Sequence, residues 1–137
     1  MDKQKVNNLN PIVLAFVGDA VYSLFVRERL TFESDFKTGE LNKLATKEVN
    51  ATAQAEFIKE ITPLLTEEEL SVFKRARNAK KTTKSKSATI ADYNSATGFE
   101  AVLGYLYLTG QTDRLNLILN KGNTLWRLKE EILFTNY

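Results

Sequence analysis

Two strongly apolar stretches of this chain each carry a single carboxylate. Residues 14–27 read LAFVGDAVYSLFVR, with Asp19 as the lone acid, and residues 97–108 read TGFEAVLGYLYL, with Glu100 as the only charge. Around Asp19 the apolar side chains point in all directions of a 3.6-residue period, which is typical of a buried helix. We therefore expect two buried helices, each holding one acid away from bulk water.

An acid in such a place must be neutralised in some way. A buried, unpaired carboxylate becomes protonated, pairs with a cation or coordinates a metal. The structural alternative is that each acid is paired with an arginine or lysine, or is hydrogen-bonded to a neighbouring helix end. Two apolar helices with one acid each are also what a hard-cation site needs, because Mg²⁺ prefers oxygen ligands and takes one or two protein carboxylates.

The chain contains neither Cys nor His. Disulfides, thiolate metal sites, cysteine nucleophiles and Ser-His-Asp hydrolysis are therefore excluded. Any chemistry depends on carboxylates, hydroxyls, amines and an ion that they hold. With the basic segment described below, the two acids favour metal-assisted phosphoryl transfer on a nucleic acid.

Helical periodicity and capping residues account for most of the 137 residues. Residues 1–9 are expected to fray, apart from Val6 and Leu9. Helices are expected over 11–30 with Asn10 as the cap, over 40–61, and over 66–79 behind a capping box. Further helices are expected before Gly110 with Asp92 or Asn94 as the cap, from 112 or 113 to 121, and from 123 onward. No stretch alternates with a period of two residues, so the sequence predicts an all-α fold of six or seven helices in a single domain, 1–137.

Nothing in the sequence suggests a membrane span or a leader peptide. The apolar runs are interrupted by charges well short of the roughly 20 residues that a bilayer span requires. We therefore expect a cytoplasmic protein.

Positive charge is concentrated in one segment. Residues 74–86, KRARNAKKTTKSK, hold seven of the 19 basic residues and no acid, although the net charge of the whole chain is only +2. Such a cluster indicates a polyanionic partner, and a solvated loop is the alternative. Within it, residues 80–90 are rich in Lys, Thr and Ser, and are expected to form a mobile basic loop.

Both acidic stretches resemble signatures of the ribonuclease III family. LAFVGDAVY is similar to the form LEFLGDAVL, and TGFEAVLGYLYLTG is similar to DxxEAxxGAxYLDGG, at a spacing that also fits. RARNAK with the basic loop, followed by YNSATGFEAVLGYLYL, resembles the short mini-ribonuclease III branch, which has the catalytic domain without an RNA-binding domain. The resemblance implies the helical fold of the ribonuclease III endonuclease domain.

The resemblance also implies which residues act. Asp19 matches the catalytic aspartate and Glu100 the catalytic glutamate, both ligands of Mg²⁺. Full-length enzymes have further acids where this chain has Ile12, Ala15 and Thr97, so a second metal ion is in doubt.

Substrate and partners follow from the same resemblance. It implies endonucleolytic cleavage of double-stranded RNA by a homodimer, with the stem of precursor large-subunit (23S) ribosomal RNA as substrate and a large-subunit ribosomal protein as a possible helper. Phe16, Val17, Tyr22 and Phe25 are candidates for core and interface. The expected phosphate contacts lie in the basic segment: Arg75, Arg77, Asn78, Lys80, Lys81, Lys84 and Lys86. A non-catalytic RNA-binding or ribosome-associated module with the same fold is the alternative function, and a DNA-binding helical protein is a weaker one.

Overall fold

The computed structural model describes residues 1–33, 43, 51–80 and 89–121, and these are helical nearly throughout, with no strand among them. The helices are α1 (Lys3–Asn7), α2 (Pro11–Glu33), α4 (Ala51–Ile61), α5 (Glu67–Asn78) and α6 (Ile90–Leu108), with a short 3-10 turn η1 (Thr62–Leu64). Residues 112–121 form a further helix. The prediction of an all-α fold is confirmed. None of the described helices is long and apolar enough to span a membrane.

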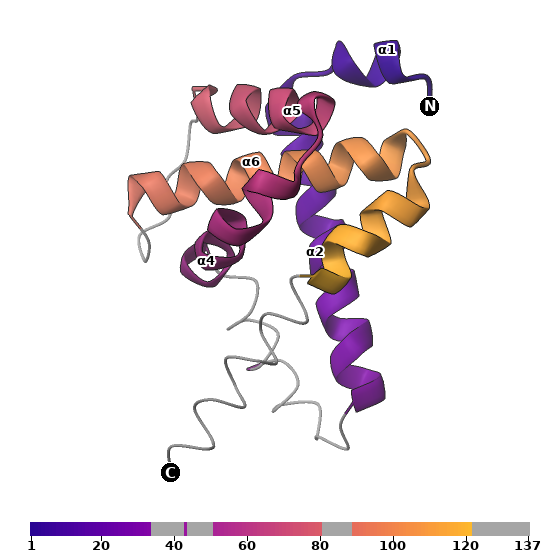
Figure 1. Cartoon of the computed structure of the whole chain (residues 1–137), viewed down its shortest axis with the longest axis vertical. Coiled ribbons are helices and arrows are strands. Elements are labelled where there is room, and N and C mark those ends of the chain that lie inside the picture. Colours follow the sequence, from indigo (N-terminus) through magenta and orange to yellow (C-terminus); the bar gives the residue numbers. More distant parts are fainter. Residues whose placement is uncertain (34–42, 44–50, 81–88, 122–137) are drawn as a thin grey trace.

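Helix α6 is the centre of the arrangement. Figure 1 shows it crossing the long helix α2, with α5 packed along one side of it and α4 close to it on another. Five consecutive or nearly consecutive side chains of α6 are completely buried: Ala101, Val102, Leu103, Tyr105 and Leu106. The middle of this apolar helix is buried on all sides, as its sequence predicts, whereas Tyr107 near its end is 58% exposed.

Helix α2 departs from that prediction, because only one side of it is buried. Leu14 and Val26 are fully covered, but Phe16 is 80% and Leu24 66% exposed. A helix that is apolar all round can hide one face in its own domain and leave the other to a partner, and the sequence pattern does not separate these cases. The prediction that α2 is buried on all sides is wrong for the single chain.

The helix starts follow local hydrogen bonding. Asn10 Oδ1 accepts from the Ile12 amide at 2.9 Å, and Pro11 occupies the first helical position, where its missing N–H costs nothing. At the start of α6 the predicted caps, Asp92 and Asn94, are wrong. The hydroxyl of Thr89 accepts from the Asp92 amide at 3.1 Å, which places Asp92 in the first turn, where a carboxylate favours the helix dipole.

Helix α6 ends at the predicted place. Gly110 has φ +72°, and the amides of Gly110 and Gln111 donate to Tyr107 and Leu106 at 3.1 and 2.9 Å. This is a Schellman motif, which favours glycine because the left-handed conformation burdens any residue with a Cβ. The chain then turns directly into the helix of residues 112–121.

Helix α1 corrects a further expectation, since residues 1–9 are not frayed. Val6 is completely buried, as predicted. Lys3 forms an ion pair with Glu68 at 3.5 Å, and Arg75 donates to both the backbone and the side-chain oxygen of Asn7 at 3.0 and 3.1 Å. One buried valine, one ion pair and two hydrogen bonds therefore hold α1 against the rest of the fold.

Several predictions fall on residues outside the described ranges. These are the first part of the helix predicted over 40–61, most of the basic loop at 80–90, and the helix predicted from 123 onward. The helix predicted over 66–79 is confirmed as α5, including its capping box between Thr66 and Glu69.

Candidate active site

Asp19 and Glu100 are brought together by a close crossing of two helix backbones. A Cβ added to Gly18 would lie 1.6 Å from the carbonyl oxygen of Glu100, and one added to Gly104 would lie 2.0 Å from that of Leu14. Both distances are far inside van der Waals contact. Only glycine permits this approach, which places Asp19, the next residue after Gly18, beside the turn of α6 that carries Glu100.

The two carboxyl groups interact directly. Burial, the negative charge of Asp19 and a side-chain hydrogen bond with Asp19 together raise the pKa of Glu100 to about 8. A hydrogen bond between two acids requires a proton on one of them. Near neutral pH and without a cation, Glu100 therefore carries a proton.

Asp19 itself is exposed, whereas Glu100 is partly buried. The prediction that Asp19 is withdrawn from bulk water is wrong, because Asp19 lies at the edge between the buried side of α2, which carries Tyr22, and the uncovered side, which carries Phe16. The prediction that the two acids meet stands on the hydrogen bond and charge interaction between them. The outcome is an acid pair that is anchored in the core on one side and open to solvent on the other.

This donor set fits a hard divalent cation. Two carboxylates with one open side offer oxygen ligands and leave room for the waters that Mg²⁺ keeps. Within the described ranges no group of three or more Asp, Glu, His or Cys side chains gathers at a possible metal site. Ala15 and Thr97 stand where full-length enzymes have acids, and both are buried. The Thr97 hydroxyl donates to the backbone oxygen of Tyr93 at 2.9 Å.

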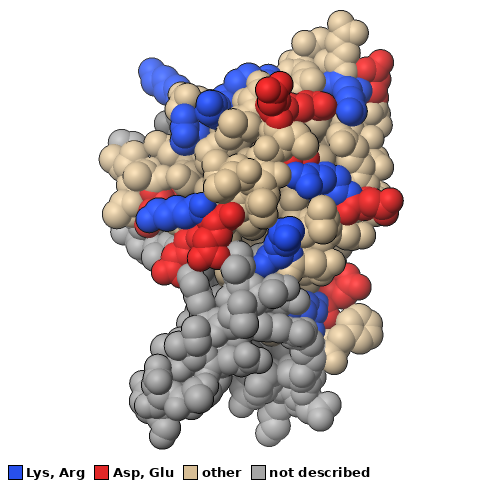
Figure 2. Space-filling model, in the orientation of Figure 1, with Lys and Arg blue, Asp and Glu red and all other residues tan. Residues whose placement is uncertain are grey.

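The predicted phosphate contacts are described only in part. Lys81, Lys84 and Lys86 lie outside the described residues. Lys80 and Asn78 are exposed at the end of α5, and Figure 2 shows Lys and Arg gathered there without an acid between them, at the upper left. Elsewhere on the face in view, the described residues mix both signs of charge.

Arg75 and Arg77 make contacts within the protein that the sequence did not predict. Arg75 binds Asn7, as described above. Arg77 lies over the Phe73 ring at 5.6 Å and donates from Nε to Asn78 Oδ1 at 3.2 Å. These contacts orient the two guanidinium groups, and their contact with phosphate stays a prediction.

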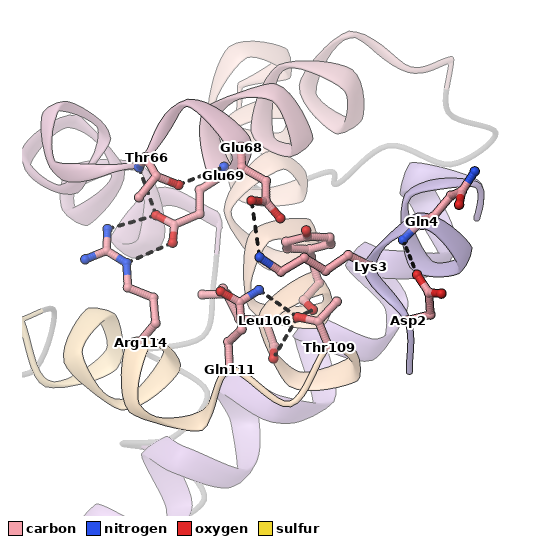
Figure 3. Close-up of polar contacts among 11 residues, drawn as sticks. Asp2, Lys3, Gln4, Thr66, Glu68, Glu69, Leu106, Thr109, Gln111 and Arg114 are labelled. Carbon is pink, nitrogen blue, oxygen red and sulfur yellow. Dashed lines mark hydrogen bonds and ion pairs between the residues drawn. The ribbon is translucent and has the colours of Figure 1, made fainter.

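The sequence did not predict the ion pair of a third acid, Glu69. Arg114 donates to both of its carboxylate oxygens at 2.8 Å (Figure 3). Arg114 also donates to the backbone oxygen of Leu64 at 2.8 Å. The Thr66 amide donates to Glu69 as well, at 3.0 Å. The capping box was visible in the sequence, but nothing there indicates a partner 45 residues away. This cluster ties the start of α5 to the helix of residues 112–121.

Comparison with known proteins finds a family match that includes Asp19 and Glu100. A family model described as the ribonuclease III domain matches residues 12–111, which include both acids. The chain belongs to the ribonuclease III family. This membership confirms the resemblance seen in the sequence, and with it the assignment as an endoribonuclease that cleaves double-stranded RNA.

Individual relatives show which members of the ribonuclease III family the chain is similar to. The chain is 48% identical to "Mini-ribonuclease 3" of Clostridium tetani over 118 residues, covering 85% of this chain and 78% of that one. The protein of the same name from Staphylococcus aureus is 37% identical, with 91% and 97% covered. A crystal structure of a Fusobacterium nucleatum protein superposes with a TM-score of 0.74 at 33% identity, covering 82% of this chain and 90% of that one. The chain is therefore similar to mini-ribonuclease 3 proteins over most of its length.

Proposed function

We propose that this endoribonuclease depends on Mg²⁺ held by Asp19 and Glu100. The observation that carries the proposal is the contact of the two acids, which raises the pKa of Glu100 to about 8. A divalent cation would relieve the repulsion that a proton relieves in its absence. The open side of the pair at Asp19 leaves access for water and for a phosphodiester.

The residues of the chain then have separate tasks in hydrolysis. Glu100 would lose its proton to solvent on binding the cation, and Asp19 and Glu100 would together hold the cation beside the phosphodiester. A bound divalent ion supplies an activated water and stabilises the leaving oxygen. No imidazole or thiol takes part, since the chain has neither.

Double-stranded RNA is recognised mainly through its shape, its 2′-hydroxyls and its phosphates. Phosphate contacts are assigned to the basic segment, of which Lys80 and Asn78 are exposed at the end of α5. For the mini branch we propose precursor large-subunit (23S) ribosomal RNA as the substrate and the cytoplasm as the place of action. A large-subunit ribosomal protein is the proposed helper in presenting the stem.

We propose further that the enzyme acts as a homodimer through the uncovered side of α2. Val13, Phe16 and Leu24 are 45%, 80% and 66% exposed, and their spacing places them in one stripe along the helix. Exposed apolar patches of this kind mark interaction sites. Asp19 lies three residues after Phe16, so a two-fold interface along this stripe would bring two acid pairs to one side of the dimer.

Cleavage of a double-stranded RNA separates the enzyme from the alternative of a non-catalytic module. We expect the wild type to cut in Mg²⁺ and to stop in EDTA, and Asp19→Asn to bind the RNA without cutting it. Asp113→Asn, which alters an exposed acid on the helix of residues 112–121, is the matched control and should cut normally. If the wild type binds but does not cut in Mg²⁺, the module is the better description.

Sedimentation tests the homodimer. Phe16→Asp should turn a dimer into a monomer, because it places a charge in the centre of the proposed interface. Leu117→Asp is the control, since Leu117 is also exposed, at 47%, but lies on another helix. A wild type that sediments as a monomer at micromolar concentration, or equal behaviour of the two variants, would contradict the proposed interface.

A further inference from the structure

Beside the acid pair, an aromatic contact joins α2 to α6. The rings of Tyr22 and Phe99 pack edge to face, with centroids 5.8 Å apart and an interplanar angle of 81°. Both side chains are nearly covered, at 6% and 4% exposure. Aromatic pairs have a preferred geometry in addition to the area that they bury, so this contact constrains how the two helices lie.

On both helices the ring lies close to the acid along the chain. Tyr22 follows Asp19 by three residues and so lies one turn further along the same side of α2. Phe99 directly precedes Glu100. Each ring therefore packs within one turn of the backbone that carries one of the acids.

The glycine contacts and the ring contact constrain different things. At Gly18 and Gly104 the backbones touch, which limits how closely the helices approach. Contacts concentrated at one crossing still allow two rods to pivot about it. Tyr22 lies one turn away from Gly18, and a contact at that distance from the crossing opposes such a pivot.

We propose that Tyr22 and Phe99 are positioning residues for the metal site, whose contact holds the carboxyl groups of Asp19 and Glu100 at the separation at which both bind one divalent cation. The inference rests on the proposed metal dependence and extends it to two residues that touch neither the cation nor the RNA. Residues that orient metal ligands typically account for 10–100-fold in affinity. A purely structural role would instead change the stability alone.

The test is to measure Mn²⁺ binding to the RNA-free protein by electron paramagnetic resonance, at a temperature where every variant is folded. Phe99→Leu and Tyr22→Leu should each weaken Mn²⁺ binding by about tenfold. The double variant should bind about as weakly as either single one, because both remove the same contact. Tyr22→Phe, which keeps the ring, should bind within about twofold of the wild type.

Phe57→Leu is the matched control. Phe57 is as buried as Phe99, at 4% exposure, but belongs to α4, which carries neither acid. It should lower the melting temperature comparably and leave Mn²⁺ binding unchanged. If Phe99→Leu and Tyr22→Leu bind Mn²⁺ as Phe57→Leu does, the positioning role is overturned while the metal site stands. If the wild type binds no Mn²⁺, the metal site is overturned and this inference with it.

Discussion

Two glutamates of this protein lie in opposite surroundings. Glu69 is 3% exposed and has its charge matched by Arg114, which donates to both carboxylate oxygens. Glu100 is partly buried, and among the described residues its charged partner is a second acid, Asp19. Both are surrounded by the same core of helices, so the difference between them comes from their partners.

The partners shift the two acids in opposite directions. Burial alone would raise the pKa of Glu69, but the hydrogen bonds and charge of Arg114 and the Thr66 amide outweigh it and lower the pKa. At Glu100 burial and Asp19 act together and raise it to about 8. The charge of Glu69 is thus matched within the fold, which it stabilises. Glu100 has no cationic partner among the described residues and is suited to bind a cation from outside. Sites of function commonly retain such a cost in stability.

Exchanging each glutamate for glutamine should separate the two roles, and this is the largest effect that we expect. Glu100→Gln should lower RNA cleavage by more than about 100-fold, because loss of a ligand exceeds the 10–100-fold cost of losing a residue that supports one. Glu69→Gln should cut at close to the wild-type rate wherever it is folded. Cleavage rates with a stem-loop RNA in Mg²⁺ measure both variants. Equal losses of activity would show that the comparison is mistaken.

Part of this comparison could be predicted from the sequence. Asp19 and Glu100 stand out in the sequence because apolar residues flank them, and a helix with a defined start at Asn10 and Pro11 follows from local chemistry. From the sequence alone the meeting of the two acids is a hypothesis, since a sequence does not say which helices cross.

Other features could not be predicted, for physical reasons. Gly18 and Gly104 have no local signal that they touch another backbone, and the partner of Arg114 is 45 residues away in the chain. The exposure of Phe16 and Asp19 depends on what covers α2, and an apolar helix face has the same sequence whether its own core or a second chain covers it.

Removing the cation from the structural pair should cost stability. Arg114→Leu leaves Glu69 buried with only the Thr66 amide and hydroxyl as partners, and we expect a loss of about 2 kcal/mol in the free energy of unfolding. Lys3→Ala removes the cation of an exposed pair, Lys3 and Glu68, whose side chains are 57% and 43% exposed, and should cost less than about 1 kcal/mol. Urea unfolding measures both. A loss for Arg114→Leu no greater than for Lys3→Ala would place Glu69 among ordinary surface acids.

The two glutamates should give opposite pH dependences of stability in the metal-free protein. Between pH about 4.5 and 8 the folded state holds the proton of Glu100 that the unfolded state has lost, so stability falls as pH rises. Below about pH 4.5 the unfolded state takes up a proton more readily than folded Glu69, so stability falls as pH falls. Each group can contribute at most about 1.4 kcal/mol per pH unit.

Unfolding at a series of pH values in EDTA tests these signs. Glu100→Gln should remove the fall in stability between pH about 4.5 and 8, which we call the neutral limb, and keep the fall below pH about 4.5, the acid limb. Arg114→Leu should flatten the acid limb and keep the neutral limb. A neutral limb that Glu100→Gln leaves unchanged would mean that Glu100 titrates normally.

The smallest expected effect comes from replacing Asp19 with a cation, so that Glu100 has a basic partner as Glu69 has in Arg114. Asp19→Lys places a cation against Glu100, so the metal-free protein should gain about 1 kcal/mol at pH 8. The same variant should neither bind Mn²⁺ nor cut RNA. Asp92→Lys, which alters an acid in the first turn of α6, is the control and should not stabilise the fold. A loss of stability in Asp19→Lys would argue against repulsion between the two acids.

We propose that Glu100 carries a proton beside Asp19 until a divalent cation replaces it. The most direct measurement is the titration of the Glu100 side-chain carboxyl carbon by nuclear magnetic resonance, with and without Mg²⁺. We predict a midpoint near pH 8 without the ion and a midpoint well below that with it. A midpoint near 4.5 in the metal-free protein, or one that Mg²⁺ does not move, would contradict the account.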